Sequence, residues 1–110
     1  MSGYRRAAVA AYKERKSVAG VYALTCEASG EVWVGDALDI DKVWNRIAFA
    51  LRGGAHPRRS IQDACAKHGA AAFRFEILER LAEEPSIYAR DSALKARREF
   101  WRESRGAASV

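Results

Sequence analysis

Four side chains of this 110-residue chain have types that could act together on a phosphate ester: Tyr22, Arg46, His56 and Glu99. A tyrosine phenol, with a pKa of about 10, exchanges its proton near neutral pH only when cations or a metal ion lie beside it. An arginine guanidinium can hold a phosphate through two parallel hydrogen bonds. A loop histidine can move a proton or contact phosphate, and one carboxylate with water molecules suits Mg²⁺ or Mn²⁺. This chemistry requires elements that bring the four residues together.

The first of these elements is a predicted β-hairpin. Residues 18–26 and 31–35 are rich in β-favouring residues, and Gly30 between them suits a turn. The hairpin carries Tyr22 on its first strand and Trp33 on its second strand.

Helical spacing of apolar residues accounts for most of the remaining chain. It predicts a helix over 39–52 that begins with Asp39 as a cap, and a second helix over 58–68 that follows Pro57. Alternating apolar and charged residues over 72–78 predict a third strand. Ser86 is a capping residue for a long last helix that runs to about residue 102.

The expected architecture is a single α+β domain over residues 1–110, with a small three-stranded antiparallel sheet flanked by helices. Residues 1–17 form an extra N-terminal helix in this prediction, residues 18–103 form the core, and residues 104–110 form a frayed tail.

Three segments give the chain a resemblance to the GIY-YIG nuclease family. They are Gly20-Val21-Tyr22, then Val32-Trp33-Val34-Gly35 about ten residues later, and Arg98-Glu99-Phe100-Trp101 on the last predicted helix. The order of predicted elements over residues 18–102 is also that of the nuclease core. The resemblance implies an endonuclease that hydrolyses phosphodiester bonds in DNA with one divalent ion, Mg²⁺ or Mn²⁺.

The resemblance also implies roles for individual residues. Tyr22 would help to take the proton from the attacking water, and Glu99 would bind the metal ion. The family's arginine stands eight residues after the second-motif glycine, where this chain has Val43, so Arg46 on the same predicted helix is expected to replace it. His56 lies thirteen residues after Val43, an offset at which some homing endonucleases of the family have a histidine.

Two further positions depart from the family pattern. Trp33 stands where the family has its second-motif tyrosine, and an indole N–H can donate a hydrogen bond but cannot accept a proton. The family's late asparagine has no counterpart, because the sole asparagine of the chain is Asn45.

Charge and composition suit an anionic partner. The formal net charge is +5 and the pI is about 9.6. Contacts with nucleic acid are expected from several basic and aromatic side chains: Trp33, Arg52, Arg58, Arg59 and Arg98. The basic segment 4–16 is either a solvated helix or an arm that binds phosphate.

The two cysteines, Cys26 and Cys65, have no metal-binding spacing and are expected to be buried reduced thiols of a cytoplasmic protein. No apolar run approaches the roughly 20 residues that a membrane span needs.

Three functions follow as hypotheses. The first is a divergent metal-dependent endonuclease that acts on single-stranded or structured DNA, since the chain has no evident sequence-reading module. The second is a nucleic-acid-binding module that has lost catalysis, which Val43 and Trp33 favour. The third is an interaction protein whose basic helices bind an acidic partner. The sequence does not predict an oligomeric state.

Overall fold

The computed structural model describes residues 17–110 of the chain, and the expected N-terminal helix lies outside these residues. The described elements are, in chain order, β1 (Gly20–Cys26), β2 (Val32–Ala37), α2 (Val43–Arg52), α3 (Arg59–His68), the short 3₁₀ helix η1 (Ala70–Ala72), β3 (Phe73–Arg80), α4 (Ile87–Arg105) and β4 (Ala108–Ser109). No helix within residues 17–110 is long and apolar enough to cross a bilayer.

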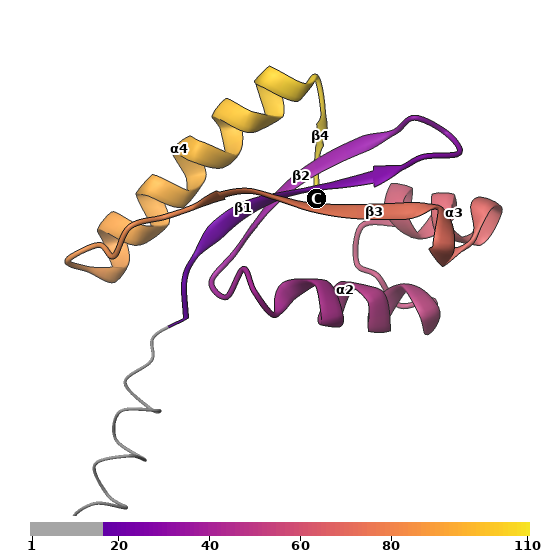
Figure 1. The fold of residues 1–110 in the computed structure, drawn as a ribbon, viewed down its shortest axis with the longest axis horizontal. Coiled ribbons are helices and arrows are strands. Elements are labelled where there is room, and N and C mark those ends of the chain that lie inside the picture. The colour runs from indigo at the N-terminus through magenta and orange to yellow at the C-terminus, as the bar shows by residue number, and fades with distance from the viewer. Residues whose placement is uncertain (1–16) are drawn as a thin grey trace, which may run out of the picture.

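The sheet has the strand order β3-β1-β2-β4 (Figure 1). The central strand β1 pairs antiparallel with β2 on one side and with β3 on the other. The predicted α+β class and the antiparallel hairpin are therefore confirmed. The prediction of three strands is corrected to four, because β4 pairs with β2 in parallel.

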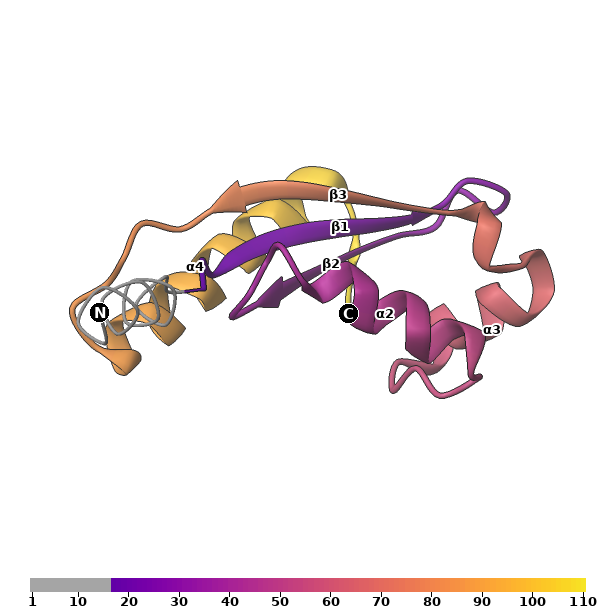
Figure 2. The ribbon, with the colours of Figure 1, turned by 60° about the horizontal axis from the view of Figure 1, so that its bottom comes forward.

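The end of the chain is ordered rather than frayed as expected. Helix α4 continues to Arg105 and ends at Gly106, whose φ of 60° is the left-handed conformation that glycine adopts without a Cβ clash. The Val110 N–H then donates to the Val34 carbonyl at 3.0 Å, and Ala107 is buried under the sheet. Figure 2 shows that this end of the chain lies beside α2.

The two faces of the sheet bury two separate apolar clusters, because successive strand side chains point to opposite faces. Tyr22, Leu24 and Trp33 face α2 and α3. Val21 and Val34 face the other way, toward α4 and the end of the chain. In Figure 1, α4 lies above the sheet and α2 and α3 lie below it.

The helix ends differ in how well the sequence predicts them. The Ser86 side chain accepts from the Ala89 N–H at 3.0 Å, so the predicted cap of α4 is confirmed. Helix α2 begins at Val43 rather than after Asp39, because the Asp39 carbonyl closes a turn by accepting from the N–H groups of Lys42 and Val43.

Candidate functional site

A cavity of about 400 Å³ lies where the β1–β2 hairpin, α2, the loop after α2 and the end of the chain meet. We call it the pocket. Its polar lining brings together side chains from distant parts of the sequence: Tyr22, Asp36, Arg46, His56 and Arg58. Three of the four residues expected to be catalytic, Tyr22, Arg46 and His56, therefore meet at one site.

Tyr22 is the most deeply buried of these residues, with 3% of its surface exposed. Its ring packs against Phe75, and its phenol lies over Gly35, where an added Cβ would come within 2.7 Å of the phenol oxygen. Burial, then the negative charge of Asp36, raises the pKa of Tyr22 to about 12, although Arg46 opposes the rise. The phenol is therefore protonated at neutral pH and can donate a hydrogen bond.

His56 is held in a fixed orientation by the loop between α2 and α3. Its backbone N–H donates to the Gln62 side-chain oxygen at 2.9 Å, and its Nδ1 accepts from the Arg58 N–H at 3.0 Å. Because Nδ1 accepts, the neutral imidazole carries its proton on Nε2. Burial, aided by the nearby Arg58 charge, lowers the pKa of His56, so the ring is a neutral donor at pH 7.

Two guanidinium groups reach the pocket from different elements. Arg46 comes from the exposed side of α2, and Arg58 precedes α3. Arg58 Nη2 donates to the Val110 oxygen at 3.1 Å, so the end of the chain forms part of the pocket wall. Val43 also lines the pocket, but as an apolar wall.

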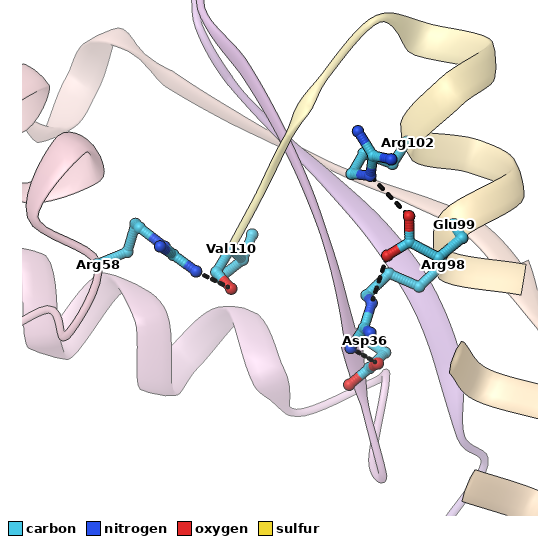
Figure 3. A network of polar contacts seen from close by, with 6 residues as sticks. All are labelled: Asp36, Arg58, Arg98, Glu99, Arg102 and Val110. Carbon is cyan, nitrogen blue, oxygen red and sulfur yellow. Dashed lines mark hydrogen bonds and ion pairs between the residues drawn. The ribbon is translucent and has the colours of Figure 1, made fainter. Parts of the chain in front are cut away.

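Glu99 does not join these residues. Its carboxylate accepts from Arg102 Nε at 2.8 Å, and Arg98 Nε lies 3.8 Å away. The hydrogen bond from Arg102 is the main reason that the pKa of Glu99 is lowered. Figure 3 shows that Arg98, the residue before it, extends from α4 to Asp36, where Arg98 Nη1 donates to Asp36 Oδ2 at 2.8 Å.

The residues around Glu99 do not fit the divalent ion that the resemblance implies. Asp36 and Glu99 are each bound by a guanidinium, so a metal ion at either carboxylate would lie beside a fixed positive charge. Within residues 17–110, no three His, Cys, Asp or Glu side chains are grouped so that they could hold a metal ion. The positively charged side chains that line the pocket are Arg46 and Arg58.

The residues expected to contact nucleic acid lie in different environments. Trp33 is 1% exposed, stacks on Phe73 and donates its indole N–H to the Ser60 hydroxyl at 3.0 Å, so the expectation of a nucleic-acid contact there is wrong. The Arg59 side chain is 93% exposed and lies 4.0 Å from Asp63, outside the pocket lining. Arg52 is exposed at the end of α2.

Asp36 and Val110 line the pocket, although the sequence analysis does not single them out. Asp36 directly follows the glycine of the second motif, and a charged residue at that position is the signal that could have indicated it. Nothing in the local sequence around Val110 indicates its place in the pocket, because the contact depends on pairing between distant strands.

Comparisons with known proteins agree with this fold. No protein-family profile and no curated protein matches the chain. Among solved structures, a point variant of the catalytic domain of intron endonuclease I-TevI is 28% identical, with a TM-score of 0.67 over 81% of this chain and 84% of that chain. The catalytic domain of homing endonuclease I-TevI is 26% identical, with a TM-score of 0.69 over 84% of this chain and 97% of that chain.

The resemblance to the GIY-YIG nucleases is thereby confirmed. The fold is that of a homing-endonuclease catalytic domain, and this similarity supports a nuclease function in general.

Proposed function

We propose that this protein acts on DNA by binding one backbone phosphodiester in the pocket. The observation that carries the proposal is that four residues with hydrogen-bond donors line a single cavity: Arg46, Arg58, His56 and Tyr22. Charged donors to phosphate form the stronger class of hydrogen bond, and a partly buried site strengthens them further. The endonuclease neighbours support DNA as the ligand.

Hydrolysis of the bound phosphodiester is the second candidate function, and the similarity to endonuclease catalytic domains favours it. In such a reaction Arg46 and Arg58 would balance the charge that develops on the phosphoryl oxygens. His56, with its proton on Nε2, would donate a hydrogen bond to the leaving oxygen, which would take its proton from solvent water. Because its pKa is raised to about 12, Tyr22 keeps its proton at neutral pH and cannot take another, so the proton of the attacking water would pass to Asp36 after that carboxylate leaves Arg98.

The form of DNA is a further part of the proposal. The polar side chains that line the pocket suit contacts with the sugar-phosphate backbone rather than with base edges, so we propose single-stranded or structured DNA as the preferred ligand.

Two adjacent arginines provide a matched test of binding. We expect Arg58→Ala to weaken binding of a labelled single-stranded oligonucleotide by about tenfold, as the loss of one charge-assisted hydrogen bond would. Arg59→Ala removes the same charge one residue away, outside the pocket, and should change the affinity by less than about threefold. Fluorescence anisotropy at fixed salt measures both. Equal losses for the two variants would contradict binding in the pocket.

Cleavage is tested on the same single- and double-stranded oligonucleotides, in parallel reactions with Mg²⁺, with Mn²⁺ and with a chelator. Cutting that His56→Gln and Asp36→Asn each abolish would establish the endonuclease. Intact binding with no cutting in any reaction would restrict the function to binding.

A further inference from the structure

The exposed face of α2 carries a large apolar side chain that the fold does not use. Phe49 is 81% exposed, although the buried residues of this helix, such as Ile47 and Leu51, face the sheet as an amphipathic helix requires. A phenylalanine on the solvent face contributes almost nothing to folding, because its apolar surface stays in water. Tyr88 is exposed to a similar degree, so what distinguishes Phe49 is the pair of charged residues beside it on the helix.

Phe49 stands between two arginines on the same face of α2. Arg46 precedes it by three residues and Arg52 follows it by three residues. Side chains three residues apart on a helix differ by about 60° in direction and about 4.5 Å in rise, so the aromatic ring lies in a row with two positive charges.

This row begins at the pocket. Arg46 lines the pocket, and Phe49 follows it by about one helical turn, so the Phe49 side chain lies about one turn from a pocket residue. A strand with one phosphate held in the pocket would therefore pass along α2 with a neighbouring base close to Phe49. The flanking guanidinium groups match the charge of the strand's backbone.

We infer that Phe49 is a stacking platform for an unpaired nucleobase of the strand whose phosphodiester occupies the pocket. The inference rests on the proposed function and specifies its ligand, which is single-stranded DNA or a base displaced from a duplex. Every base has a flat aromatic face, so a stacking platform supplies affinity without reading sequence.

The test compares Phe49→Ala with Tyr88→Ala in the full chain. Tyr88 is 84% exposed on the first turn of α4 and does not line the pocket, so it controls for the loss of an exposed aromatic ring. We expect Phe49→Ala to weaken binding of a single-stranded oligonucleotide by between about 5-fold and 150-fold, the range for loss of one base–aromatic stack. Phe49→Trp and Tyr88→Ala should stay within about twofold of the wild type.

A spectroscopic readout separates stacking from general loss of affinity. An oligonucleotide with 2-aminopurine should lose fluorescence on saturation with the wild type and with Phe49→Trp, and should keep it on saturation with Phe49→Ala. If Arg46→Ala weakens binding while Phe49→Ala changes neither affinity nor fluorescence, the stacking inference is overturned and the proposed function stands. If the wild type binds no DNA at any salt concentration, both are overturned.

Discussion

The guanidinium of Arg98 neutralises the carboxylate of Asp36 at the edge of the pocket. Its guanidinium is bound to Asp36, and its Nε is buried without a hydrogen-bond partner among the described residues. Arg98 neutralises Asp36, and Arg102 neutralises Glu99 in the same way. If an acidic residue replaced Arg98, its carboxylate would face Asp36, and the two negative charges would attract a cation.

We therefore predict that Arg98→Glu creates a divalent-ion site that the wild type lacks. Three carboxylates, counting Asp36 and Glu99, would then be available to a hard cation that prefers oxygen ligands. Isothermal titration with Mn²⁺ should show binding to the variant at least about tenfold tighter than any binding to the wild type. Lys67→Glu, which makes the same charge change on α3, should behave as the wild type. If the wild type binds Mn²⁺ and the Glu99→Gln variant does not, then Arg98 and Arg102 do not exclude a metal ion.

His56 makes the stability of the fold depend on pH, and the lowering of its pKa determines whether stability rises or falls as the pH falls. Burial lowers the pKa of His56 from its ordinary value of 6.5, so the unfolded chain takes up this proton first as the pH falls. The stability that neutral His56 contributes is complete above about pH 6.5 and is lost as the pH falls through the folded-state pKa. Glu79 and Glu99, whose pKa values lie below 4.5 in the folded protein, titrate at lower pH.

The matching prediction concerns urea unfolding between about pH 7.5 and pH 5. The free energy of unfolding of the wild type should decrease over this interval, and the decrease should be smaller in His56→Gln, which cannot be protonated. His68→Gln, at the end of α3, serves as the control. An identical decrease in wild type and His56→Gln would assign the pH dependence to another group.

Strand β4 links the sheet to the pocket. It pairs with β2 over only two residues, yet it anchors Ala107 in the α4-side core and brings Val110 to Arg58. A two-residue parallel pairing provides little stability by itself, so burial of the Ala107 side chain should contribute much of what holds the strand in place.

We expect Ala107→Asp to detach β4, because an unpaired carboxylate at this buried position costs more than the strand contributes. The Val110 amide should lose its protection from hydrogen exchange while the amides of β1 stay protected. The free energy of unfolding should fall by about 1 to 2 kcal/mol. Ala108→Asp places the same charge on an exposed position of β4 and should leave the exchange pattern unchanged. Retained protection of Val110 in Ala107→Asp would show that other contacts hold the strand.

The sequence predicts the elements whose signals are local. The hairpin, α3 and the Ser86 cap follow from turn residues, periodicity and a side-chain cap that act over a few positions. β4 does not, because Ala108 and Ser109 favour a strand only when β2 lies beside them.

The candidate site also depends on contacts that the local sequence does not predict. Successive helix residues differ by about 100° in direction, so no sequence motif could decide whether Arg98 or Glu99 would face the pocket. Tyr22, Arg46 and His56 do line one pocket, and they stand on or beside elements whose order the sequence predicts.

At the scale of the whole molecule, the positive charge is unevenly distributed along the chain. Of the 19 basic and 14 acidic residues, residues 1–16 contain five basic residues and one acidic residue. Residues 17–110 are therefore close to neutral, with 14 basic and 13 acidic side chains. In the proposed function, long-range attraction to DNA would depend mainly on the first segment, whereas the pocket would supply a local, oriented contact.

Salt dependence separates these two contributions. Affinity for single-stranded DNA falls with salt by a logarithmic slope of about 0.7 for each neutralised phosphate. We expect Arg46→Ala to reduce the slope by about 0.7 and to weaken binding at every salt concentration. A variant with glutamine at five basic positions of the first segment should lower the slope by up to about 3.5. Its affinity should approach that of the wild type at high salt, where only the pocket contact remains. The five positions are Arg5, Arg6, Lys13, Arg15 and Lys16. An unchanged slope in the glutamine variant would mean that the pocket and α2 carry the whole electrostatic contact, and that the basic segment serves another partner.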